Sequence, residues 1–135
     1  MATVRRQVRI ARPARDVWAM VGDPAALAGW FPGIVDAHVD GTTRVVTTAS
    51  GIPMPETIVT NDPLQRRFQY RITAPIVHDH LGTIDVFDLG DGTSLVAYAT
   101  DCTPDALALI IGGACGNALY ELARQLESVT GQPGG

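Results

Sequence analysis

The chain has 135 residues, which is enough for one domain with a hydrophobic core and too few for two. Hydrophobic residues make up 46% of the sequence and charged residues 18%, a composition typical of a folded globular protein and not of a disordered one. The formal net charge of -4 argues against a nucleic-acid partner, because such partners bind basic surfaces.

The N-terminal sequence and the spread of apolar residues bear on where the protein works. Residues 1–6 contain no apolar run of the kind found in a secretory signal. No stretch approaches the roughly 18 consecutive apolar residues of a membrane span. We therefore expect a cytoplasmic protein with no membrane span, in which Cys102 and Cys115 stay reduced.

The first third of the sequence predicts one strand and two short helices. Residues 2–10 alternate between apolar and polar side chains, which is the period of a strand. Pro13 begins a short helix, and Asp23 caps a second one over residues 24–28. The turn after these helices carries two large aromatic side chains, Trp30 and Phe31. Because aromatic side chains in a loop are unfavourable unless buried, the pair forms either a lid over the core or the mouth of a pocket.

The middle of the sequence predicts a meander of antiparallel strands. Alternating segments separated by turn signals fall at residues 34–39, 43–49, 56–60, 67–73, 80–89 and 94–101. Residues 50–55 are expected to form a loop, because Pro53 and Pro55 cannot donate hydrogen bonds to a sheet. With the first strand, these segments make a sheet of about six or seven strands.

The last part of the sequence predicts one long helix. Thr103 supplies the cap and Pro104 the first helical position, and the helix continues to Val129. At the helical period, seven residues fall on one apolar face, namely Leu107, Ile111, Cys115, Ala118, Leu122, Leu126 and Val129. A stripe of this length needs a wide apolar partner, and the predicted sheet is the partner available.

Two glycines lie in the middle of this helix, and a short glycine-rich tail follows it. Glycine costs a helix interior about 1 kcal/mol, so Gly112 and Gly113 indicate either close packing against a neighbour or room for a ligand. The tail, residues 131–135, is expected to be flexible.

The order of elements predicts an α+β fold in which a curved antiparallel sheet wraps around the C-terminal helix. Several segments are also typical of a known family: residues 11–18 (ARPARDVW), residues 27–32 (LAGWFP), the pair of strands that combines Glu56, Asp62, Pro63 and residues 67–72 (RFQYRI), and the hairpin at residues 90–93 (GDGT). They resemble the START-like superfamily, also called SRPBCC or Bet v 1-like, and most closely its small bacterial members described as polyketide cyclase/dehydrase. The resemblance implies a single helix-grip domain over residues 1–130, with a cavity between sheet and helix for a small hydrophobic ligand, polyketide-like or lipid-like.

The alternation within strands predicts which side chains face this cavity. The fifth strand places Phe68, Tyr70 and Ile72 inward, and the sixth places His80 and Gly82 inward. Since Gly82 has no side chain, the imidazole of His80 is expected to have a free flank there.

The last hairpin leaves two registers open. A three-residue loop places Tyr98 inside, opposite Ile84, whereas a four-residue loop places Asp101 opposite His80. The ligand-binding residues expected from these patterns are Trp30, Phe31, Met54, Ile84, Tyr98, Asp101, Ile111 and Cys115.

Three polar side chains on the inner faces are candidates for catalysis: His80, Glu56 and Tyr70. His80 is a candidate general base near neutral pH, and so is Glu56 if desolvation raises its pKa. A tyrosine would donate to a carbonyl or an enolate. Each has a structural alternative: a core histidine bonded to Glu56 or a tyrosine, an ion pair of Glu56 with Arg44 or Arg71, and a core aromatic whose hydroxyl is satisfied.

Two classes of function remain. The first is a cofactor-independent enzyme that cyclises or dehydrates its ligand by acid–base chemistry, and the second is a non-catalytic carrier or sensor of an apolar ligand. No metal is expected, because His78 and His80 have no evident third ligand, and no cofactor motif is present. A monomer or homodimer is expected.

Overall fold

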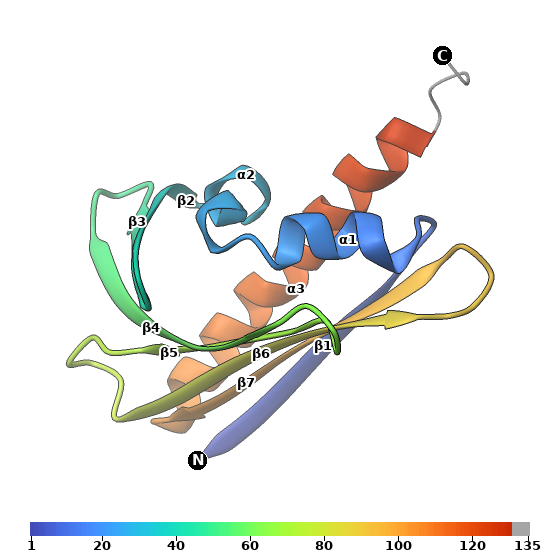
Figure 1. Ribbon diagram of the computed structural model, residues 1–135. Coiled ribbons are helices and arrows are strands. Elements are labelled where there is room, and N and C mark those ends of the chain that lie inside the picture. The colour runs from blue at the N-terminus through green and yellow to red at the C-terminus, as the bar shows by residue number, and fades with distance from the viewer. Residues whose placement is uncertain (131–135) are drawn as a thin grey trace.

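The computed structural model describes residues 1–130 and contains one sheet and one long helix (Figure 1). The elements follow in the order β1 (Ala2–Ile10), α1 (Ala14–Val21), the 3-10 helix η1 (Pro24–Ala26), α2 (Leu27–Trp30), β2 (Ile34–Asp40), β3 (Thr43–Thr48), β4 (Pro53–Asp62), β5 (Arg67–Ile72), β6 (Asp79–Asp88), β7 (Ser94–Thr103) and α3 (Asp105–Thr130). The predicted tail, residues 131–135, lies outside the described residues.

The seven strands form one antiparallel sheet in the order β1-β7-β6-β5-β4-β3-β2. The sheet curves around α3, and α1 and α2 lie at its upper rim in the view of Figure 1. Residues of α3 and of the central strands share one core, which includes Ala118, Leu122, Phe68, Ile84 and Val86. The predicted α+β helix-grip fold is therefore confirmed.

The short helices follow their local signals. The Asp23 side chain accepts a hydrogen bond from the Ala25 backbone N–H at 3.0 Å, which is the expected cap. The single helix expected over residues 24–28 is divided into η1 and α2, and α2 continues to Trp30.

The strand β4 begins three residues earlier than expected, at Pro53. On the β5 side the pairing starts only at Glu56, opposite Ile72, whereas on the β3 side Pro55 already lies opposite Val45. The ladder with β5 thus ends before the prolines, although the Pro55 carbonyl still accepts a hydrogen bond from the Thr73 N–H just beyond β5. Proline is tolerated in such positions, because fewer sheet hydrogen bonds are lost there.

Most of the predicted apolar face of α3 is buried, but the structure corrects the burial of Val129 and the residue at which the helix begins. The buried members are Cys115, Ala118, Leu122 and Leu126, joined by Ala108 and Leu119. Val129 is 55% exposed, so its assignment to the buried face was wrong, and the last turn of α3 projects beyond the sheet (Figure 1). The helix begins at Asp105 because Thr103 is still part of β7, where it pairs with Asp79.

The two helix glycines have different surroundings. A Cβ atom built on Gly112 would lie 2.6 Å from Cγ1 of Val4 in β1, whereas one on Gly113 would meet nothing within 4 Å. Close packing against a neighbouring strand therefore explains Gly112, and it is the first of the two alternatives that the sequence allowed.

By length and composition, α3 is also apolar enough to span a membrane, with a mean hydropathy of 1.5 over its most apolar window. In this fold it is the core helix of the domain, because Ala118 and Leu122 are fully buried against the sheet. Burying a leucine side chain in this way stabilises the folded state by about 1.5–3 kcal/mol.

Candidate functional site

A pocket of about 270 Å³ lies between the N-terminal half of α3 and the concave face of β3, β4 and β5. The loop between α2 and β2 forms its third side. The lining residues are Leu27, Phe31, Pro32, Gly33, Ile34, Val46, Thr48, Met54, Glu56, Tyr70, Ile72, Ile110, Ile111 and Ala114. Almost all of these are apolar, and Glu56 is the one charged side chain among them.

Glu56 is held by an ion pair with Arg44 from the neighbouring strand. The two residues lie directly opposite each other in the β3–β4 ladder, and both point to the concave face. Arg44 Nε donates to Glu56 Oε1 at 2.7 Å, and both side chains are almost completely buried. The ion pair is one of the two that the sequence suggested for Glu56.

Arg44 itself lies behind the pocket wall. Its guanidinium carbon is 5.2 Å from the ring centre of Phe68 and 5.0 Å from that of Tyr70, distances at which an aromatic face attracts a cation. Nη1 donates to the carbonyl of Pro24 at 3.1 Å. Nη2 is buried and makes no hydrogen bond within residues 1–130.

The carboxylate of Glu56 therefore has one oxygen engaged and one available. Oε1 accepts from Arg44, and Oε2 accepts no hydrogen bond from any described residue. Burial raises the pKa of Glu56 above its usual range, and the charge of Arg44 offsets this effect only in part. Glu56 thus combines a raised pKa with a free oxygen at the pocket wall.

Tyr70 also lines the pocket, and its hydroxyl is paired with that of Tyr98. Tyr98 lies opposite Ile84 in the β6–β7 ladder, so the register is the one expected from a three-residue loop. Burial raises the pKa of both tyrosines well above their usual range, so both remain protonated at neutral pH. The ring of Tyr70 passes over Gly82, where a Cβ atom would lie 2.6 Å from it.

This contact corrects the expectation for His80. The space left by Gly82 is filled by Tyr70 and does not give the imidazole a free flank. The His80 ring packs against Tyr70 with 5.5 Å between ring centres, and the side chain is buried outside the pocket lining.

The hydrogen bonds of His80 also bear on its expected role as a base. Nδ1 accepts the Ile72 backbone N–H at 3.0 Å, so in the neutral ring the proton is on Nε2. Nε2 is buried and has no partner among the residues described. The one lone pair suited to a base is therefore already used. Burial, together with the charge of Arg71, lowers the pKa of His80 to about 4.

The other expected ligand-binding residues divide into two groups. Phe31, Met54 and Ile111 line the pocket. Trp30, Ile84, Tyr98 and Cys115 are buried in the core and do not line it. The aromatic turn thus has both expected roles, since Trp30 covers the core and Phe31 forms part of the pocket.

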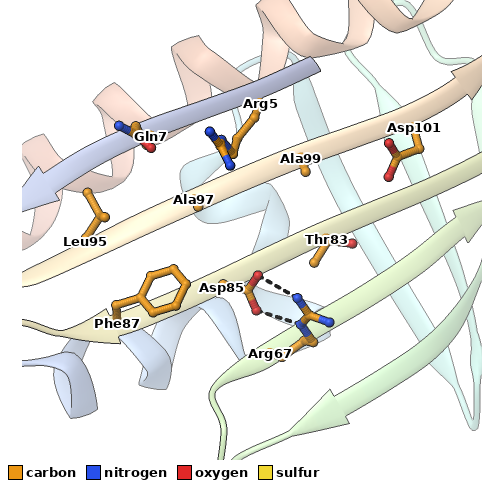
Figure 2. Close-up of a pocket in the computed structure, with 10 residues that line it drawn as sticks. All are labelled: Arg5, Gln7, Arg67, Thr83, Asp85, Phe87, Leu95, Ala97, Ala99 and Asp101. Atoms are coloured by element: carbon orange, nitrogen blue, oxygen red, sulfur yellow. Dashed lines mark hydrogen bonds and ion pairs between the residues drawn. The ribbon is translucent and has the colours of Figure 1, made fainter. Parts of the chain in front are cut away.

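Asp101 lies on the opposite face of the sheet, which corrects its expected position inside the cavity. It is opposite Leu81 in the β6–β7 ladder and accepts a hydrogen bond from Thr3 Oγ1. It lines a trough of about 470 Å³ on this outer face. Figure 2 shows it on the same strand as Ala97 and Ala99, whose small side chains also line the trough. An ion pair between Arg67 and Asp85, with contacts of 2.8 and 3.0 Å, forms one wall of the trough.

Several lining residues were not expected from the sequence. They are Leu27, Pro32, Gly33, Ile34, Val46, Thr48, Ile110 and Ala114, whereas Ile72 lines the pocket on the inner face where the alternation of its strand placed it. Val46 and Thr48 share the alternation of Arg44, so the strand period carried a signal for them. Ile110 and Ala114 lie at the edge of the apolar face of α3, and only the position of the helix on the sheet brings them to the pocket.

The two histidines at the start of β6 have different surroundings. His78 precedes β6 and is exposed, whereas His80 is buried. Within residues 1–130, no group of three or more His, Cys, Asp or Glu side chains is placed to hold a metal ion.

Solved structures of other proteins share this fold over nearly the whole chain. Protein XoxI from Bacillus cereus is similar over 96% of this chain and 99% of its own, with a TM-score of 0.90 and 23% identity. A START superfamily protein from Mycobacterium smegmatis is similar over 94% of this chain and 98% of its own, with a TM-score of 0.71 and 14% identity. At such identities the similarity shows the fold alone.

A third similar structure is the di-domain ARO/CYC protein BexL of the BE-7585A biosynthetic pathway. It is 23% identical, with a TM-score of 0.77, and the match covers 97% of this chain and 48% of that one. No curated protein sequence matches the chain significantly. The sequence model of one family, described as polyketide cyclase / dehydrase and lipid transport, matches residues 1–127. The chain therefore belongs to the polyketide cyclase/dehydrase and lipid transport family, within the START-like fold that its sequence resembles.

Proposed function

We propose that this protein binds a compact, mainly apolar ligand in the pocket between α3 and strands β3 to β5. The observation that carries this proposal is the composition of the pocket wall, in which apolar side chains surround a single carboxylate, that of Glu56. Ligand sites in proteins are concave, mostly apolar and contain a few polar groups that orient the ligand. The family description, which includes cyclases and lipid transport, supports the same class of ligand.

The size of the pocket restricts the ligand. Its volume of about 270 Å³ lies just below the range of roughly 300–1,000 Å³ that is common for small-molecule sites. It suits a ligand with one or two rings or a short chain better than a two-chain lipid.

A pair of matched variants tests this proposal. Ala114→Trp introduces a large side chain at the pocket wall, whereas Asn117→Trp adds the same side chain at an exposed position of α3 outside the lining. We expect the neutral fluorescent probe N-phenyl-1-naphthylamine to bind the wild-type protein and Asn117→Trp, and to bind Ala114→Trp at least about tenfold more weakly. Equal binding to both variants would place the probe elsewhere and contradict the proposal. Mass spectrometry of small molecules that co-purify with the protein would then identify the natural ligand.

A second candidate function is proton transfer by Glu56. Its raised pKa and its free Oε2 favour this candidate, because a general base works best with a pKa close to the working pH. In a dehydration, Glu56 would remove a proton from the carbon next to a carbonyl and then return it to the departing hydroxyl, which leaves as water. Tyr70 at the same wall would donate to the carbonyl oxygen as charge develops there, with Tyr98 as the donor in the bond between the two hydroxyls. Without such chemistry, the same pocket serves a carrier or sensor.

The dehydration of 4-hydroxy-4-phenylbutan-2-one, followed by the ultraviolet absorbance of the conjugated product, tests this second candidate. We expect Glu56→Gln to lower any protein-dependent rate by about 100-fold or more while probe binding is retained. Asp36→Asn, which removes one exposed carboxylate of β2, is the control and should keep the rate. Unchanged turnover in Glu56→Gln would exclude Glu56 as the base, and no turnover by the wild-type protein would favour the carrier.

A further inference from the structure

Glu56 also restricts the polar group that a ligand of this pocket can carry, an inference that rests on the proposed function. The pocket wall has three residues with polar side chains, Thr48, Glu56 and Tyr70. The Thr48 hydroxyl is bonded to Ser50 and to the backbone of Ile52, and the Tyr70 hydroxyl is bonded to Tyr98. Oε2 of Glu56 is the polar side-chain oxygen of this wall that has no partner among the residues described.

A carboxylate oxygen accepts hydrogen bonds and cannot donate them. A ligand that enters the pocket must therefore bring a donor to Oε2, or leave this oxygen partly desolvated without a partner. Leaving a charged group in that state is unfavourable, so a donor on the ligand gains affinity relative to an apolar group of the same shape.

The positive charge of Arg44 does not reverse this preference. Arg44 lies behind Glu56 and is absent from the pocket lining. Nε is bonded to Glu56 and Nη1 to Pro24, and the guanidinium packs against the rings of Phe68 and Tyr70. Nη2 has no partner among the described residues, but it is buried with the rest of the guanidinium and does not line the pocket. An anionic ligand group in the pocket would thus meet the carboxylate first, with the guanidinium on the far side of it.

From this geometry we infer that the pocket selects ligands whose polar end is an alcohol, a phenol or an ammonium group on a compact apolar body, and discriminates against the matching carboxylates. The polar end lies against Glu56 Oε2, and the apolar body lies among side chains such as Ile34, Val46 and Ile111. A fatty or aromatic acid of the same size is therefore a poor ligand for this site.

Four probes that share one apolar body test the inference at pH 7.5. They are 2-methylnaphthalene, 2-naphthylmethanol, 2-naphthylmethylamine and 2-naphthoic acid, and their binding is followed by naphthalene fluorescence. We expect the alcohol and the ammonium to bind the wild-type protein about tenfold or more tightly than the carboxylate. In Glu56→Gln this difference should fall to about threefold or less, while 2-methylnaphthalene binds with little change. Asp36→Asn removes the same charge from an exposed site and should keep the wild-type pattern.

The outcomes separate this inference from the proposed function. If 2-naphthoate binds the wild-type protein as tightly as the alcohol, or if Glu56→Gln keeps the wild-type selectivity, the preference for donors is wrong although the pocket still binds apolar ligands. If none of the four probes binds the wild-type protein, the proposed function fails and the inference fails with it. Should Glu56→Gln not fold, the double variant Arg44→Met/Glu56→Gln leaves no unpaired charge and is judged by the same criteria.

Discussion

Arg44 and Glu56 form an ion pair inside the curved sheet, with 2.7 Å between Nε and Oε1 and with 2% and 4% of the two side chains exposed. Each charge depends on the other, because both side chains are almost completely buried. Removal of one partner leaves a buried charge without compensation, which is far more unfavourable than removal of both.

A double-mutant cycle on this pair should therefore be strongly non-additive. We expect Arg44→Met and Glu56→Gln each to lower the free energy of unfolding by about 3–5 kcal/mol, and the double variant to lose clearly less than the sum. Urea unfolding at pH 7 measures all three variants. Additive losses would show that the two side chains act independently, contrary to the geometry.

The adjacent glycines of α3 should respond to alanine in opposite ways. Gly113→Ala adds a methyl group in open space and should raise the free energy of unfolding by about 0.5–1 kcal/mol, because alanine favours the helix. Gly112→Ala meets Val4 at 2.6 Å, and overpacking of this kind costs about 1–3 kcal/mol. Thermal unfolding of the two variants compares them directly. A Val4→Ala change removes the closest atom, Cγ1, but leaves Cβ at 3.0 Å, so it should recover part of the loss in Gly112→Ala. Two variants of equal stability would contradict this packing.

His80 should make the protein less stable in mild acid. Its pKa in the folded state is about 4, below the usual 6.5, so between these values the unfolded chain binds a proton that the folded chain does not. Stability due to His80 is thus complete above pH 6.5 and decreases as the pH falls toward 4, by about 3 kcal/mol in total. Besides burial, the charge of Arg71 lowers the pKa of His80, whereas the charges of Asp101 and Asp79 raise it.

Urea unfolding at several pH values isolates this contribution when the wild-type protein is compared with His80→Gln, whose amide oxygen replaces Nδ1 as acceptor. The stability of the wild-type protein should fall more steeply than that of the variant between pH 6.5 and 4.5. Parallel profiles would show that His80 titrates normally and that its bond with Ile72 does not persist.

The hydroxyl pair of Tyr70 and Tyr98 should behave as one unit. Tyr98→Phe removes one hydroxyl and leaves the other without a partner, at a cost of about 1–3 kcal/mol. We expect Tyr70→Phe/Tyr98→Phe to cost less than the two single changes together, because no hydroxyl is then left unpaired. Equal and additive losses in calorimetric unfolding would argue that each hydroxyl has another partner.

The helices and strands of this protein could be predicted from its sequence, because the signals that define them lie within a few residues of one another. Strand alternation, the Asp23 cap and the helical period of residues 103–129 each involve side chains a few positions apart, and they predicted nearly all the elements. The inward positions of Phe68 and Tyr70 were predictable for the same reason, since the period of a strand is two residues.

The polar contacts of the site were decided only by the tertiary structure. The sequence allowed Glu56 to pair with Arg44 or Arg71, and it allowed either Tyr98 or Asp101 inside, because these choices depend on the register between strands. A three-residue loop placed Tyr98 inward and Asp101 on the outer face. A backbone N–H from β5 occupies the lone pair that His80 would need as a base, a contact that no spacing along one strand can reveal. Strand period is a property of neighbouring residues, whereas register and burial depend on residues brought together from distant parts of the chain.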